Sequence, residues 1–123
     1  MMKHRPWIYI IAPYSGKNVT EQQENCSFAC SIARRIWEIG GAALCPHMNS
    51  FMLDACASHA EFVRAYKRLL GKCDGVVVLG CREPSKGCRE EIAHAKRLKL
   101  PMYYNHFCED KTLEEWIKEL KIR

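Results

Sequence analysis

The stretch Asp74-Gly75-Val76-Val77-Val78-Leu79-Gly80 holds an unbroken apolar run made mostly of β-branched residues. Such residues favour strands, and a strand without polar alternation is typical of the centre of a parallel sheet, where both faces are buried. Further apolar runs at 7–12, 42–45 and 101–104 predict three more strands.

Amphipathic helical patterns separate the predicted strands. Apolar residues recur at helical spacing in the ranges 18–39, 58–71, 86–98 and 112–120. Three of these ranges begin with polar capping pairs, namely Asn18 with Glu21 (or Thr20 with Gln23), Ser58 with Glu61, and Thr112 with Glu115. Residues 46–57, which follow the second strand, are expected to form a loop.

The alternation of strands and helices indicates the fold class. It predicts an α/β three-layer sandwich with a four- to five-stranded, mainly parallel sheet of the Rossmann or flavodoxin-like kind. With 123 residues, and no repeat or linker, we expect one domain over 1–123. Ligands of such sheets bind outside the carboxyl ends of the strands, so the expected site is built from the loops 13–18, 46–57 and 80–87.

The charge balance narrows the choice of partners. Lys and Arg total 19 against 14 Asp and Glu, a net charge of +5, which is too small and too dispersed for a dedicated nucleic-acid-polymer binder. No apolar run approaches the roughly 18 residues of a membrane span. A small anionic ligand fits this composition.

Eight cysteines are the unusual feature of the composition, at 26, 30, 45, 56, 73, 81, 88 and 108. The sequence begins without the apolar segment of a signal peptide, so we expect reduced cysteines that pack as small apolar residues in a cytoplasmic protein. No C-x-x-C pair is present, which speaks against zinc. The cysteine count alone would also allow a thiol-redox or zinc protein.

The segment S-K-G-C-R-E-E at 85–91 leads directly into a predicted helix. Ser85 offers a hydroxyl and Gly87 an unobstructed backbone at a helix N-terminus, where free N–H groups favour an anion. An ordinary serine N-cap followed by a glycine in the first turn explains the same residues.

Helical geometry separates the two glutamates that end this segment. Glu91 shares a face with Cys88, Ile92 and Ala95, the side that packs on the sheet, whereas Glu90 lies on the solvated face, where His94 or Arg97 is its expected partner. A half-buried carboxylate is unfavourable unless it is paired, which makes Glu91 a functional candidate. If the strands 7–12 and 74–80 are neighbours, the Tyr9 hydroxyl can reach Glu91 and orient it.

Several motifs, taken in order, carry a resemblance to a known family. They are Y-I-I-A-P-Y-S-G at 9–16, P-H-M-N-S at 46–50, C-D-G-V-V-V-L at 73–79, S-K-G-C-R-E-E-I-A-H-A-K at 85–96 and P-M-Y-Y at 101–104. The chain resembles the nucleoside 2-deoxyribosyltransferase-like superfamily, especially its small, poorly characterised bacterial and phage members. The Ser-x-Gly-x-x-x-Glu spacing is the most specific of these elements.

The resemblance implies roles for particular residues. Glu91 corresponds to the family's nucleophile and Tyr9 to the tyrosine hydrogen-bonded to it. Ser85 stands where members that cleave nucleoside 5′-monophosphates have serine, and Ser15, Gly16 and Lys17 match the glycosyl-phosphate loop. Tyr66 occupies the position of an aspartate that contacts the nucleobase or sugar, and His47 and Asn49 are further candidates for substrate contacts.

Two functional hypotheses follow from the resemblance. The first is an N-glycosidase or deoxyribosyltransferase that cleaves the N-glycosidic bond of a (deoxy)nucleoside 5′-monophosphate or nucleoside through a glutamate nucleophile. The alternative is a non-catalytic nucleotide-binding module of the same fold, suggested by the missing aspartate at Tyr66. Either requires no metal or cofactor, and the resemblance implies a homodimer or larger homo-oligomer.

Overall fold

Four parallel strands form one sheet in the order β2–β1–β3–β4. The strands are β1 (Trp7–Ile11), β2 (Ala42–Leu44), β3 (Gly75–Val78) and β4 (Met102–Tyr104). The structure is a computed structural model that describes residues 4–14, 16–50, 53–80, 86–105 and 111–123. β1 lies between β2 and β3, and its Tyr9 is opposite Leu44 on one side and Val76 on the other.

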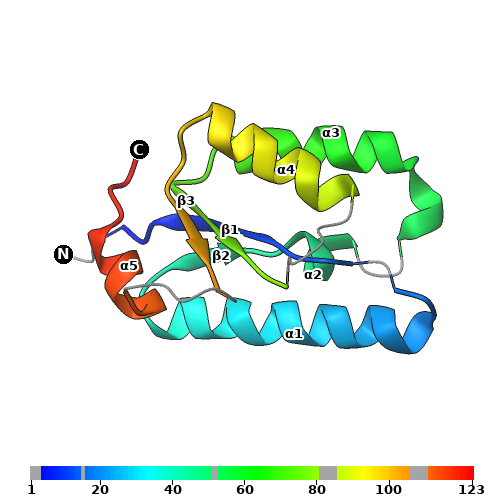
Figure 1. The fold of residues 1–123 in the computed structure, drawn as a ribbon, viewed down its shortest axis with the longest axis horizontal. Coiled ribbons are helices and arrows are strands. Elements are labelled where there is room, and N and C mark those ends of the chain that lie inside the picture. The colour runs from blue at the N-terminus through cyan, green and yellow to red at the C-terminus, as the bar shows by residue number, and fades with distance from the viewer. Residues whose placement is uncertain (1–3, 15, 51–52, 81–85, 106–110) are drawn as a thin grey trace.

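Helices cover both faces of the sheet (Figure 1). α1 (Val19–Glu38) and α5 (Leu113–Glu119) lie on one face, and α3 (His59–Leu70) and α4 (Lys86–Arg97) lie on the other. The short helix α2 (Pro46–Ser50) follows β2, and a 3-10 turn occupies Asp54–Cys56. The chain therefore has the expected α/β three-layer, flavodoxin-like fold, with four strands that are all parallel.

Alternating side chains of β1 divide the apolar core into two layers. Ile8 and Ile10 pack with residues of α1 and α5, whereas Tyr9 and Ile11 pack with residues of α3 and α4. All four side chains are almost completely buried. Because successive strand residues point to opposite faces, Tyr9 is directed to the α3–α4 side, the side that also carries Glu91.

Local sequence signals fix the ends of the helices. Asn18 caps α1 by accepting a hydrogen bond from the Glu21 backbone, and Ser58 forms a complete capping box with Glu61 at the start of α3. After α1, Gly40 adopts a φ of +109°, which favours glycine. The expected caps at Asn18, Ser58 and Thr112 are all present.

The segment 46–57 differs from its expected loop. Residues Pro46–Ser50 form α2 and Asp54–Cys56 a 3-10 turn. Proline is favoured in the first turn of a helix, where its missing N–H is not needed, so Pro46 both ends the strand and starts a helix. The strands β1, β2, β3 and β4 are one to three residues shorter than the apolar runs that predicted them.

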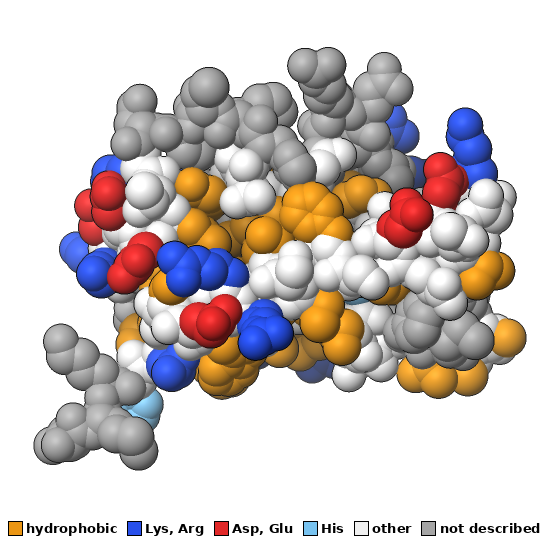
Figure 2. Space-filling model, turned by 90° about the horizontal axis from the view of Figure 1, so that it is seen from below, with side chains coloured by type: hydrophobic (Ala, Val, Ile, Leu, Met, Phe, Trp, Pro, Cys, Tyr) orange, Lys and Arg blue, Asp and Glu red, His pale blue; other side chains and the backbone are white. Residues whose placement is uncertain are grey.

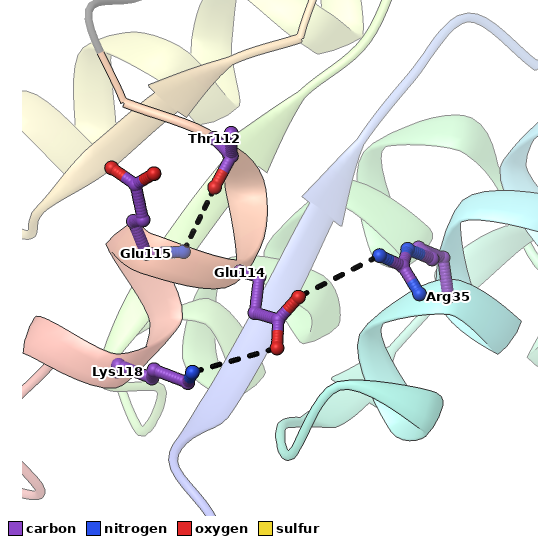
Figure 3. Close-up of polar contacts among 5 residues, drawn as sticks. All are labelled: Arg35, Thr112, Glu114, Glu115 and Lys118. Atoms are coloured by element: carbon purple, nitrogen blue, oxygen red, sulfur yellow. Dashed lines mark hydrogen bonds and ion pairs between the residues drawn. The ribbon is translucent and has the colours of Figure 1, made fainter.

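Polar contacts attach α5 to α1 (Figure 3). Glu114 lies 3.8 Å from Arg35 of α1 and 3.5 Å from Lys118 one turn later in α5, and Thr112 caps the helix through the Glu115 backbone N–H. These ion pairs are exposed and contribute little to stability. Apolar packing holds α5 in place, because the Ile117 side chain of this helix is buried in the core.

The α1 side of the molecule also presents apolar side chains to solvent. Figure 2 shows this face, with hydrophobic patches interspersed among charged groups. On α1 itself Val19, Phe28 and Trp37 are exposed, and the guanidinium of Arg5 lies 5.5 Å from the centre of the Trp37 ring. No helix in the described part of the chain is long and apolar enough to cross a membrane.

Candidate functional site

Tyr9 and Glu91 form a hydrogen-bonded pair between the sheet and α4. The Tyr9 hydroxyl donates to Oε2 of Glu91, although the two residues are 82 positions apart. Tyr9 is fully buried on β1, and Glu91 lies on the face of α4 that also carries the buried Cys88 and Ala95. Pairing of β1 with β3 brings the two side chains together, as expected from the sequence.

The surroundings of this pair favour a protonated carboxyl group. Burial raises the pKa of Glu91 to about 7, while the hydrogen bond from Tyr9 and the positive charge of Lys67 oppose that rise. Burial and the adjacent carboxylate raise the pKa of Tyr9 far above its ordinary value, so Tyr9 remains a neutral donor. Glu91 therefore titrates near neutral pH.

A pocket of about 430 Å³ opens above the Tyr9–Glu91 pair. This volume is within the usual range for small-molecule sites. Its walls come from the end of β1, from α2, from α3 and from the first turns of α4. The lining residues are Tyr9, Ala12, Tyr14, Pro46, His47, Ser50, His59, Phe62, Val63, Tyr66, Lys86, Gly87, Cys88 and Glu91.

His47 connects α2 to the segment that follows β1. It is 6% exposed, its Nε2 lies 2.8 Å from the Pro13 carbonyl oxygen, and its ring packs edge-on against Tyr14 at 5.2 Å. Because a carbonyl only accepts, Nε2 carries the proton. Burial lowers the pKa of His47, so the ring is neutral and fixed at neutral pH.

Tyr66 and Asn49 approach each other at the α2–α3 side of the pocket. Asn49 Nδ2 donates to the Tyr66 hydroxyl oxygen at 3.0 Å. Tyr66 lines the pocket, and its phenol lies close enough to Tyr9 to contribute to the raised pKa of that residue. Asn49 does not line the pocket and reaches it only through Tyr66.

The first turn of α4 supplies a cation and a glycine. Lys86 and Gly87 line the pocket together with His59 from the start of α3. A Cβ atom added at Gly87 would meet nothing closer than His59 Cε1 at 3.7 Å, which is an ordinary contact. Packing within the described chain therefore does not require glycine at this position.

The expected partner of Glu90 is wrong, and two candidate site residues lie apart from the pocket. Glu90 pairs with Lys67 of α3 at 3.9 Å, while His94 instead contacts Arg97, because the packing of α3 beside α4 brings a lysine within reach of Glu90. Gly16 and Lys17 lie outside the pocket and line a separate shallow hollow of about 400 Å³ with Glu21, Glu24 and Asn25. Ser15 and Ser85 lie outside the described residues.

Sequence reasoning missed the aromatic and cationic side chains of the pocket. Tyr14, His59, Phe62 and Lys86 line the pocket but are not among the residues predicted to form it. Phe62 and Tyr66 are four residues apart on α3, a spacing that places both on one helix face. That spacing was the available signal, but it also predicts an ordinary core contact.

The described cysteines lie apart from any recognisable metal site. Within the described ranges, no three His, Cys, Asp or Glu side chains are placed to hold a metal ion. Cys26, Cys73 and Cys88 are buried in the apolar layers, and burial raises the pKa of Cys73 to about 12. These three cysteines pack as small apolar residues.

Comparison with known proteins defines the family and the fold. The chain belongs to the family described as "Domain of unknown function (DUF7768)", which matches residues 6–105. No curated protein sequence matches it. Among solved structures it is similar to the 2-deoxyribosyltransferase of the psychrotolerant bacterium Bacillus psychrosaccharolyticus, which is described as a biocatalyst for nucleoside synthesis. The two structures have a TM-score of 0.59 and 16% sequence identity, and the match covers 84% of this chain and 77% of the other. That similarity shows a shared fold.

Proposed function

We propose that the protein is an N-glycosidase or deoxyribosyltransferase acting on a (deoxy)nucleoside 5′-monophosphate or nucleoside, with Glu91 as the nucleophile and Tyr9 as the residue that orients it. The observation that carries the proposal is the Tyr9–Glu91 hydrogen bond beneath a pocket of nucleotide-compatible size. The shared fold with a 2-deoxyribosyltransferase supports it.

The proposed reaction proceeds in two displacements. A carboxylate oxygen of Glu91 forms a bond to C1′ while the bond from C1′ to the base nitrogen breaks, and the base keeps that electron pair and takes up one proton from solvent. Water then attacks C1′ and releases the Glu91 carboxylate, the free sugar hydroxyl and one proton. In the transferase variant, a second base takes the place of water.

Ionisation of Glu91 sets the expected pH dependence. Only the carboxylate is nucleophilic, and the pKa of Glu91 is about 7. The proposed activity therefore rises with pH through neutrality, and a neutral Tyr9 keeps its donor role throughout that range. Burial weakens the solvation of the carboxylate, which leaves it more reactive toward an electron-poor C1′.

The lining of the pocket at the first turn of α4 supports a phosphate-bearing substrate. Lys86 supplies a positive charge there, and Gly87 leaves open space beside the helix N–H groups, which favour anions. Ser85 remains a candidate phosphate contact from the sequence. Gly16 and Lys17, which line the separate hollow, are proposed to reach a ligand only if it extends beyond the pocket.

The test is release of free base from a panel of deoxynucleoside and ribonucleoside monophosphates and nucleosides, followed by chromatography. Wild type should release base from at least one substrate, and Glu91→Gln should reduce the rate by a factor of 1,000 or more. Glu90→Gln is the matched control, because Glu90 pairs with Lys67 outside the pocket. If wild type releases no base from any member of the panel, the enzymatic proposal is wrong.

A nucleotide-binding module without turnover is the second candidate. It is favoured by one observation: among the described residues, Glu91 is the only carboxylate that lines the pocket. A thermal shift by a nucleotide that is recovered intact would support binding alone. Base release that depends on Glu91 would instead show that the protein is an enzyme.

The assembly of the protein is also a proposal. We propose, from the resemblance to the deoxyribosyltransferase-like superfamily, that the protein is a homodimer or larger homo-oligomer. Light scattering at several protein concentrations measures this directly, and a monomer at all concentrations would contradict it.

A further inference from the structure

Residues 12–14 leave β1 and contribute Ala12 and Tyr14 to the wall of the pocket. They follow the last residue of the strand, Ile11, and Pro13 lacks the N–H that a sheet hydrogen bond requires. Carbonyl groups outside regular secondary structure still need donors where they are withdrawn from solvent. The position of this part of the wall therefore depends on donors from other elements.

Two side chains from different helices supply such donors. His47 of α2 donates from Nε2 to the Pro13 carbonyl oxygen at 2.8 Å, and Asn25 of α1 donates from Nδ2 to the Tyr14 carbonyl oxygen at 3.3 Å. α2 lies beside the segment that leaves β1 (Figure 1). The His47 ring also packs against the Tyr14 ring at an angle of 86°, with the ring centres 5.2 Å apart. His47 therefore contacts both the backbone and an aromatic side chain of this segment.

His47 is itself held in one place. It is the second residue of α2 and is 6% exposed. Burial lowers the pKa of His47, so the ring is neutral at neutral pH, and with the proton on Nε2 its Nδ1 atom can only accept. The ring thus offers an anionic ligand no further N–H, and it acts on the pocket through the segment that it holds.

We propose that His47 is a positioning residue that fixes Tyr14 as a wall of the pocket before the ligand binds. Binding then does not have to order this segment, which raises the affinity for the ligand and leaves the chemical step unchanged. The inference rests on the proposed function for the ligand, a nucleotide. The contacts between His47 and residues 12–14 do not depend on that function.

Three substitutions separate the hydrogen bond of His47 from the bulk of its ring. His47→Gln places an amide NH₂ where the ring has Nε2, His47→Asn places it where the ring has Nδ1, and His47→Leu has no donor. The glutamine alone can reach the Pro13 carbonyl from the position of Nε2. Tyr103→Phe is the matched control, because it also removes a side-chain donor from a backbone carbonyl, that of Lys111, but away from the pocket.

Nuclear magnetic resonance without ligand tests the positioning itself. In wild type, the nitrogen shifts of His47 should show a neutral ring protonated at Nε2. The backbone order parameter of Tyr14 should be about 0.85 in wild type, His47→Gln and Tyr103→Phe, and should fall below about 0.6 in His47→Asn and His47→Leu. A proton on Nδ1 in wild type, or the same order parameter in every variant, would overturn the inference.

Steady-state kinetics test the consequence for the ligand. For a nucleoside monophosphate that wild type cleaves, His47→Asn and His47→Leu should raise KM about tenfold and keep kcat within about threefold. His47→Gln should stay within about threefold of wild type in both constants, because it restores the hydrogen bond. An equal fall of kcat in all three variants would contradict a role in positioning the pocket wall.

This proposal and the proposed function fail in different ways. If wild type cleaves nucleotides and His47→Leu has the KM of wild type, the positioning role is wrong while the Glu91 chemistry stands. If wild type cleaves no nucleotide, but Tyr14 becomes mobile in His47→Asn and His47→Leu and stays ordered in His47→Gln, the positioning role stands and the proposed enzymatic function fails.

Discussion

Glu91 makes the stability of this protein depend on pH. Its pKa is raised from 4.5 to about 7 by burial, so the folded chain holds this proton more tightly than the unfolded chain. The resulting stability is present below pH 4.5 and is lost as pH rises through 7. Each pKa unit between the two states is worth about 1.4 kcal/mol, which gives a loss of about 3 kcal/mol by pH 8.

Replacing Glu91 by glutamine should remove this loss. A neutral amide oxygen still accepts the Tyr9 hydrogen bond, so we expect Glu91→Gln to equal wild type near pH 4 and to exceed its free energy of unfolding by up to about 3 kcal/mol at pH 8. Urea denaturation of both proteins at the two pH values measures the difference. If the free energy of unfolding changes with pH in the same way in both proteins, Glu91 is not the group that titrates.

Tyr9→Phe should move the titration of Glu91 in a known direction. The Tyr9 hydrogen bond stabilises the carboxylate and so lowers the pKa of Glu91. Without the hydroxyl, the pKa rises above about 7, and the midpoint of the kcat/KM profile against pH should shift upward with it. An unchanged midpoint in Tyr9→Phe, with Tyr103→Phe as reference, would contradict this role.

At the scale of the helix, a substitution at Gly87 should affect stability and nucleotide binding differently. Glycine in a helix is less favourable than alanine by up to about 1 kcal/mol, and the added Cβ would make only an ordinary contact with His59 at 3.7 Å. We therefore expect Gly87→Ala to leave thermal stability equal or slightly higher while it weakens nucleotide binding severalfold, because the methyl group enters the pocket. Thermal denaturation with and without nucleotide measures both effects, and unchanged affinity would contradict a ligand role for this glycine.

The elements that could be predicted from sequence are those with strong local signals. The apolar run of β3, the capping box at Ser58 and the glycine after α1 each depend on residues that are adjacent or three apart. Helix α2 is not predictable from sequence because five residues carry too little periodicity, and because a proline after an apolar run can either end a strand or begin a helix.

Sequence alone predicts those parts of the candidate site that depend only on the geometry of one helix. The inward direction of Glu91 follows from its spacing to Cys88 and Ala95. The partner of Glu90 depends instead on how α3 packs beside α4, and it differs from expectation. Whether Lys17 lines the same pocket as Glu91 also depends on how separate elements pack. The contact between Asn49 and Tyr66 joins two helices whose relative position no sequence pattern encodes.

At the scale of the whole molecule, the C-terminal helix belongs to the same packed unit as the sheet. The family match ends at residue 105, yet a Cβ at Gly75 of β3 would lie 2.9 Å from Trp116 and 3.0 Å from Leu120. β3 and α5 are therefore in close contact beyond the family boundary. On this basis we propose that residues 1–123 form one domain.

Asp74 links three distant parts of this unit. It is 5% exposed, its Oδ2 accepts the Trp7 backbone N–H at 2.7 Å, and its Oδ1 accepts the Arg123 backbone N–H at 2.6 Å. It thus joins the start of β1 and the residue Arg123 to the turn before β3. Hydrogen bonds to a charged acceptor each contribute about 1.5–3 kcal/mol.

Asp74→Asn should therefore destabilise the whole molecule and not only one end. The new amide NH₂ would face one of the two backbone N–H groups, leaving a buried donor without an acceptor, so we expect a loss of about 2–3 kcal/mol in the free energy of unfolding. The exposed Glu119→Gln, which breaks only a surface pair with Lys111, should change it by less than about 1 kcal/mol. In a single domain, circular dichroism and tryptophan fluorescence should report one shared transition that shifts to lower urea in Asp74→Asn. Separated transitions, or a shift no larger than that of Glu119→Gln, would contradict a role for Asp74 in joining these segments.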